Sequence, residues 1–131
     1  MLRSDGLRRA VLLITAAVFV LIAVHANVQP QAAHLGRHLD DVDALSEFRA
    51  IYLGLWLATA LLLVIAARRV RDGILGDLGA LLILGQVFGR LVSLIVDGLP
   101  GPSIWAIGSL ELVGGLVILA VRPGGPANVP G

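Results

Sequence analysis

Apolar residues along this chain gather into four runs that are separated by shorter polar segments. The runs cover residues 10–26, 50–67, 74–96 and 103–121. A helix needs about 20 apolar residues to cross the hydrocarbon core of a bilayer, within a range of about 17 to 25. The pattern therefore predicts an all-α protein, an integral membrane four-helix bundle formed by a single domain.

The composition supports a membrane protein and excludes several other classes. Of the 131 residues 57% are hydrophobic, and the mean hydropathy of +0.91 is too high for an ordinary soluble domain. The net charge of only +1 argues against a nucleic-acid partner, and the absence of cysteine excludes disulfides and thiolate metal sites. The basic residues other than histidine are all arginines, a bias that a GC-rich bacterial genome would produce.

A polar segment, residues 27–46, follows the first run and is predicted to be a loop on the outer side. His34 and His38 stand four residues apart in it, a spacing that can hold a metal ion on a helix. No signature such as H-E-x-x-H surrounds them, so we expect a solvated loop without a metal and keep the two histidines only as candidates. The tail, residues 122–131, is rich in proline and glycine and is predicted to be disordered.

The first run also fits a second interpretation, a cleaved signal peptide. It follows Arg3, Arg8 and Arg9 and ends at the small-residue sequence Val24-His25-Ala26. We favour a retained helix, because an apolar core of this length is at the long end of the range for such signals.

The third run contains an arginine that the rest of the chain must accommodate. Gln86, Arg90, Ser93 and Asp97 fall on one side of a helix. A guanidinium facing lipid at mid-membrane costs at least ~2.5 to 3.5 kcal/mol, so this polar side should face protein or water. Glu47 and Glu111 are the acids that could meet it.

The third and fourth runs are predicted to form an antiparallel hairpin. The sequence Asp97-Gly98-Leu99-Pro100-Gly101-Pro102 between them favours a tight turn. At 1.5 Å per residue, Arg90 and Glu111 lie ~10 and ~12 Å from the same membrane surface. We therefore predict that Arg90 and Glu111 form an ion pair.

Small and aromatic residues suggest how the helices pack. Gly85 and Gly89 have the spacing that allows close approach of another helix, from this chain or from a second one. Gly108 and Gly115 share a face of the fourth run with Glu111. Tyr52 and Trp56, near the start of the second run, are interpreted as anchors at the membrane interface.

The arginines predict the orientation of the bundle. Seven of the ten flank one side of a four-span arrangement, namely Arg3, Arg8, Arg9, Arg68, Arg69, Arg71 and Arg122. By the positive-inside rule both termini are cytoplasmic, which for a bacterial protein places the chain in the inner membrane.

Two sequence motifs resemble those of a known family. One is Glu47-Phe48-Arg49-Ala50-x-Tyr52-x-Gly54-Leu55, and the other is Gly89-Arg90-x-x-Ser93-x-x-x-Asp97-Gly98-x-Pro100, followed by Glu111 in the last run. Together they resemble a family of small bacterial four-helix membrane proteins catalogued as a domain of unknown function. The family usually has paired glycines after the tyrosine, where this chain has Leu53-Gly54. The resemblance covers the first run to Val121 and implies a four-helix fold with an uncleaved first helix, but no substrate or reaction.

Two functions remain open. We favour an interaction or accessory subunit of a membrane assembly, with lipid, another membrane protein or a second copy as partners. The alternative is a binding or transport module for a small ligand, ion or lipid head group. Its outward-facing polar cluster would comprise Glu47, Arg49, Tyr52, Gln86, Arg90, Ser93, Asp97 and Glu111. The same charges could instead only lock the helices in register. No nucleophile and base pair or cofactor motif is present, so we expect no cofactor and do not favour an enzyme.

Overall fold

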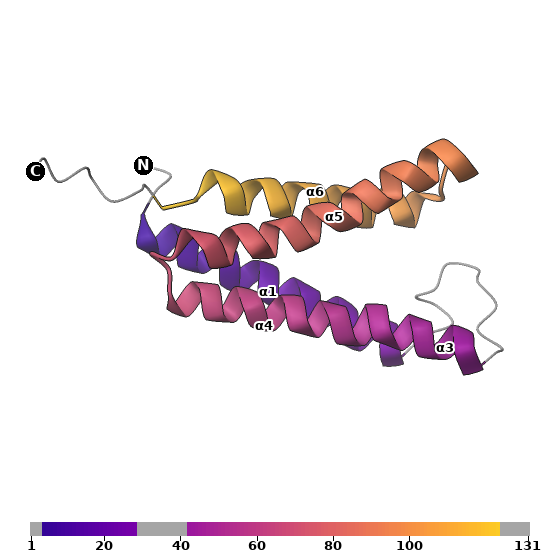
Figure 1. Cartoon of the computed structure of the whole chain (residues 1–131), viewed down its shortest axis with the longest axis horizontal. Coiled ribbons are helices and arrows are strands. Elements are labelled where there is room, and N and C mark those ends of the chain that lie inside the picture. Colours follow the sequence, from indigo (N-terminus) through magenta and orange to yellow (C-terminus); the bar gives the residue numbers. More distant parts are fainter. Residues whose placement is uncertain (1–3, 29–41, 124–131) are drawn as a thin grey trace, which may run out of the picture.

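The computed structural model describes residues 4–28 and 42–123, and every regular element within these ranges is a helix (Figure 1). The elements are α1 (Asp5–Val28), α3 (Val42–Arg49), the π-helix η1 (Ala50–Leu55), α4 (Trp56–Arg68), α5 (Gly73–Asp97) and α6 (Pro102–Ala120). Because α3, η1 and α4 follow one another without a break, the described chain has four helical rods. The all-α, four-helix prediction is confirmed. His34, His38 and most of the tail lie outside the described residues.

The second rod begins earlier than the apolar pattern predicts. It starts at Val42 instead of residue 50, so the last part of the predicted loop 27–46 is helical. The physical reason is a small cluster in which Phe48 packs against Ala26 near the end of α1, together with Ala44 and Leu45. These contacts extend the helix beyond its membrane-length apolar run.

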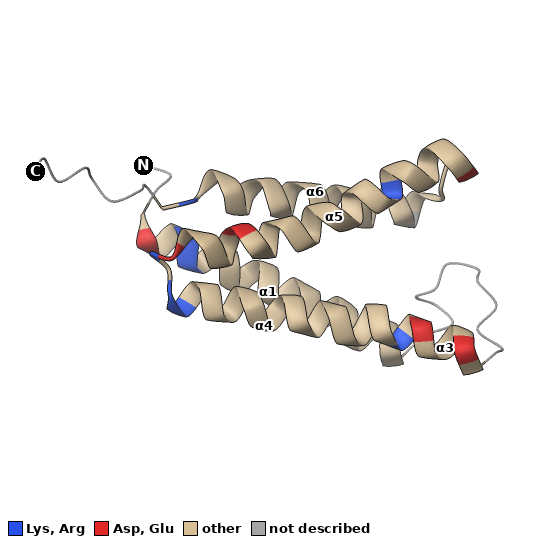
Figure 2. Ribbon diagram, viewed as in Figure 1, with Lys and Arg blue, Asp and Glu red and all other residues tan. Residues whose placement is uncertain are grey.

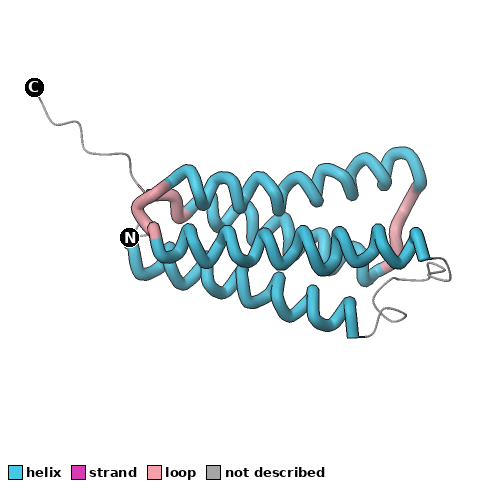
Figure 3. Tube along the Cα trace, turned by 60° about the horizontal axis from the view of Figure 1, so that its bottom comes forward, coloured by secondary structure: helices cyan, strands magenta, loops and turns pink. Residues whose placement is uncertain are grey.

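The rods form two pairs. α1 packs along α4, and α5 packs along α6. The two pairs meet at the end that carries both termini and diverge towards the α5–α6 turn (Figure 1). Figure 3 shows this turn at the opposite end of the bundle from the N-terminus. The core lies mainly between α1 and α4, where alanines such as Ala16, Ala23, Ala60 and Ala66 allow close contact.

Three of the rods are long and apolar enough to cross a membrane, namely Asp5–Val28, Val42–Arg68 and Gly73–Asp97. The apolar part of α6, Ile104–Ala120, is shorter. It remains alongside α5 because the turn between them spans only residues 98–101.

A buried arginine joins the helices at the end with the termini. Arg8 is 1% exposed, and its guanidinium donates hydrogen bonds to the carbonyl oxygens of Val121 (3.2 Å) and Asp72 (3.3 Å). Gly76 leaves room for it, since a Cβ atom there would collide with the guanidinium. One side chain of α1 therefore holds the α4–α5 turn and the end of α6. The arginine pattern predicts only a flanking charge at Arg8, but Arg8 shares a helix face with the buried Leu12 and Ala16, which is the sequence signal for its burial.

Glycines also set the contact between α5 and α6. A Cβ atom at Gly115 would lie 2.7 Å from Leu84 Cγ and Cδ2, and one at Gly108 would lie 3.2 Å from Arg90 Cδ. The predicted glycine face of α6 therefore packs against α5. Gly85 and Gly89 are different, because nothing lies within 4 Å of a Cβ atom at either position. No helix in the described chain uses that face, since the contacts of α5 fall on its other sides.

Two adjacent glycines of α6 allow a test of this packing. Alanine gains ~0.8 to 1 kcal/mol of helix propensity at either position. Gly115→Ala must also displace Leu84, and overpacking typically costs ~1 to 3 kcal/mol, so we expect a lower melting temperature. A Cβ atom at Gly114 would have only Thr15 Cγ2 near it, at 3.9 Å, so Gly114→Ala should keep or raise the melting temperature. Equal melting temperatures for the two variants in one detergent would contradict this packing.

Candidate polar site between alpha5 and alpha6

Arg90 and Glu111 form a bidentate ion pair between α5 and α6. Arg90 Nε donates to Glu111 Oε2 at 2.7 Å, and Arg90 Nη2 donates to Oε1 at 3.0 Å. The side chain of Glu111 is 6% exposed and that of Arg90 is 24% exposed. Gly108, about one turn before Glu111, leaves space for the stem of Arg90. The pair predicted from depth and turn length is present, in the paired fork geometry that gives the strongest hydrogen bonds of this kind.

A second polar contact joins α5 to α4. Trp56 Nε1 donates to Gln86 Oε1 at 2.9 Å, and Gln86 lies one turn before Arg90 on α5. The prediction that Trp56 is an interface anchor is wrong, because this residue is 3% exposed and belongs to the core. Its indole lies in the bundle because it combines a large apolar surface with one donor, and Gln86 satisfies that donor.

Aromatic rings continue from Trp56 along the second rod. Phe48 and Tyr52 are stacked with centroids 4.5 Å apart, and Tyr52 meets Trp56 edge-on at 4.7 Å. Phe19 of α1 meets Trp56 edge-on at 6.1 Å. The π-helix η1 lies between Phe48 and Trp56, within this row of aromatic rings, and it is part of the family motif Glu47–Leu55. The backbone N–H of Trp56 donates to the carbonyl of Ile51, five residues earlier, as in a π-helix. Single π turns inside α-helices are frequent at functional sites.

Four described residues of the predicted cluster, Glu47, Arg49, Ser93 and Asp97, form no hydrogen bond with the ion pair. Glu47 and Arg49 are exposed on α3, and among the described residues neither bonds to Arg90 or Glu111. Ser93 Oγ donates to Asp97 Oδ2 at 2.7 Å in an exposed local contact. The helix pairs diverge at this end, and Figure 2 shows the charged positions of α3 and those of α5 on separate arms. The eight residues of the predicted outward-facing polar cluster therefore do not form one continuous site.

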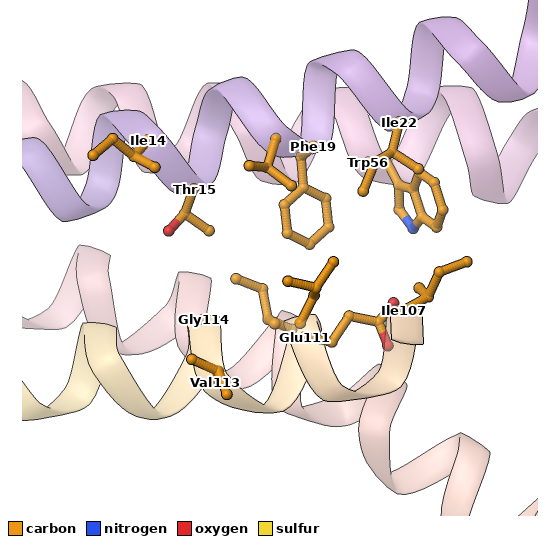
Figure 4. A pocket seen from close by; sticks show the side chains of 12 residues that line it. Ile14, Thr15, Phe19, Ile22, Trp56, Ile107, Glu111, Val113 and Gly114 are labelled. Carbon is orange, nitrogen blue, oxygen red and sulfur yellow. The ribbon is translucent and has the colours of Figure 1, made fainter. Parts of the chain in front are cut away.

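The two members of the ion pair line different pockets. Glu111 lines a cavity of about 180 Å³ between α1 and α6, with Phe19 and Trp56 on the facing wall (Figure 4). The rest of its lining is apolar except Thr15, whose hydroxyl donates to the carbonyl of Val11 at 2.9 Å. Arg90 lines a second cavity of about 120 Å³ between α5 and α6, next to Trp105 and Ser109. Both polar groups of the larger cavity already have partners, so it suits an apolar molecule better than an ion.

A metal centre is not evident in the described residues. Across positions 4–28 and 42–123, no three side chains of His, Asp or Glu gather closely enough to hold a metal ion. The candidates His34 and His38 lie outside these ranges, so the expectation about them stays a prediction.

Fold and polar pair together define a class of protein, a small four-helix bundle with membrane-length apolar helices and a charged pair buried between two of them. The chain belongs to the family described as Domain of unknown function (DUF4345), whose model matches residues 7–121. This confirms the resemblance to a family of unknown function. No curated protein and no solved structure matches the chain.

The ion pair can be tested by a double-mutant cycle. Removing one partner leaves a buried charge alone, which typically costs about 3 to 5 kcal/mol, whereas two apolar replacements can be nearly neutral. Arg90→Met and Glu111→Leu should each lower the stability or yield of the purified protein, and the double variant should recover much of it. Simple addition of the two single effects would show that the residues are not coupled.

Proposed function

We propose that this protein is a multi-pass protein of the bacterial inner membrane, with both termini in the cytoplasm, that serves as an accessory or interaction subunit of a membrane assembly. The arginine distribution supports the orientation. Arg8, Arg9, Arg68, Arg69, Arg71 and Arg122 all belong to the end of the bundle where the described termini lie (Figure 2).

The observation that carries this proposal is the uncovered glycine face of α5. Gly85 and Gly89 are one helical turn apart, both are exposed, and a Cβ atom at either would meet open space. Of the three membrane-length rods, α5 is also the least covered by the rest of the chain. In a membrane, helices associate mainly through close packing, and small residues at this spacing permit it. A helix from another chain fits this face.

Bulky residues at this face should therefore prevent association without unfolding the bundle. We expect Gly85→Leu with Gly89→Leu to keep the melting temperature but to elute as a smaller species when extracted from native membranes in a mild detergent. The matched control is Ala17→Leu with Ala58→Leu, which adds leucines at exposed positions of α1 and α4. An unchanged size for the glycine variant, or an equal loss in the control, would contradict the proposal.

A second candidate function is binding of a small apolar molecule, supported by the cavity beside Glu111. Its volume of about 180 Å³ is enough for a single aromatic ring, and its rim, which includes the exposed Ile14, Leu110 and Val113, opens to the outside of the bundle. Because the Arg90 guanidinium already holds Glu111, the geometry favours a neutral apolar ligand over an anion held by Arg90.

Filling the cavity tests this second candidate. Iodobenzene should raise the melting temperature of the protein in lipid nanodiscs, and Gly114→Leu, which places a side chain in the cavity, should abolish that shift. Gly85→Leu on the uncovered face is the control and should leave the shift intact. A shift that survives in Gly114→Leu would place the bound molecule elsewhere.

A further inference from the structure

The six described arginines at the end with the termini divide into two groups. Three of them have internal partners. Arg8 is buried on two carbonyls, Arg71 Nε pairs with Asp5 Oδ2 at 3.0 Å, and Arg122 Nη2 pairs with Asp77 Oδ2 at 2.8 Å. The carboxylates of Asp5 and Asp77 are therefore already paired with arginines. The remaining acid of this end, Asp72, accepts from the backbone N–H of Ile74 and caps α5.

The other three arginines, Arg9, Arg68 and Arg69, have no carboxylate partner within residues 4–28 and 42–123. All three are exposed. Arg9 Nε donates to the carbonyl of Ala67 at 3.2 Å, which holds its guanidinium at the last turn of α4, where Arg68 follows, and this bond does not use its two Nη groups. Figure 2 shows that the end of α4 carries basic positions only. Six described arginines and three acids, Asp5, Asp72 and Asp77, lie at this end, so a net positive patch lies where α1 and α4 reach the end of the bundle.

Below this patch the surface is apolar. Leu13 lies one helical turn from Arg9, and Leu61 lies two turns from Arg68 on the same side of α4. Their side chains are 44% and 61% exposed, and Ile65 between Leu61 and Arg68 is 38% exposed. The surface thus joins guanidinium groups at the end of two membrane-length helices to an apolar strip along them.

We propose that Arg9, Arg68 and Arg69 form a binding site for the head group of an anionic phospholipid. The planar guanidinium forks match phosphate oxygens, and the exposed apolar strip fits the acyl chains. Basic clusters at the cytoplasmic ends of membrane helices recognise anionic head groups in this way. A zwitterionic lipid such as phosphatidylcholine fits less well because its own quaternary ammonium group offsets the negative charge of the phosphate. The proposal rests on the proposed insertion in the membrane, but not on a protein partner.

Native mass spectrometry of the protein released from nanodiscs of mixed phosphatidylglycerol and phosphatidylcholine tests the site. The wild type should retain phosphatidylglycerol, and Arg68→Gln with Arg69→Gln should lower its retained fraction at least fivefold. The control, Arg71→Gln with Arg122→Gln, removes the same charge from the same end but from arginines that already have partners, and should retain the lipid. An equal loss in both variants would reveal a general charge effect and overturn the site.

Two further measurements keep the test decisive. If a double variant unfolds, the single changes Arg69→Gln and Arg71→Gln are compared in the same way. Inorganic phosphate in excess should not displace the lipid, and displacement would show a site for free phosphate instead. The size of the assembly extracted from native membranes is measured separately, so loss of lipid binding is distinguishable from failure of the accessory-subunit proposal.

Discussion

A guanidinium among apolar helices has to find hydrogen-bond acceptors, and the bundle depends on how two arginines meet that requirement. Arg8 finds backbone carbonyls at the end with the termini, and Arg90 finds the carboxylate of Glu111 between α5 and α6. Leaving either charge without partners costs several kcal/mol. Each arginine therefore restricts which helices can be neighbours and in which register.

The two arginines act at different places along the same bundle. Arg8 joins α1 to the α4–α5 turn and to the end of α6, where the two helix pairs meet. Arg90 and Glu111 join α5 only to α6, and at the diverging end no comparable charge pair between described residues ties these helices to α1 or α3. Among the described residues there, the Trp56–Gln86 hydrogen bond joins the two pairs. The pocket beside Glu111 lies between the two helix pairs, with α1 on one side and α6 on the other.

Glycine has two distinct roles in the α5–α6 half of the molecule. Gly76, Gly108 and Gly115 admit the side chains of Arg8, Arg90 and Leu84, so they serve the internal contacts. At Gly85 and Gly89, no atom of the described chain lies within 4 Å of the position that a Cβ atom would take. The same residue type thus serves internal packing on some faces of this half and leaves an open face on another, which is the basis for proposing an external partner there.

The sequence by itself determined the number and order of the helical rods and the Arg90–Glu111 pair, but not where the second rod begins. Both depend on local information, namely apolar run length, helical periodicity and a short turn that brings two residues to equal depth. Only the tertiary structure decided that Arg8 is buried, that Trp56 lies in the core, and that Glu47 and Arg49 are separated from Arg90. These outcomes depend on how two helix pairs cross and diverge. That geometry arises from side-chain packing between distant segments, which periodicity along one helix does not encode.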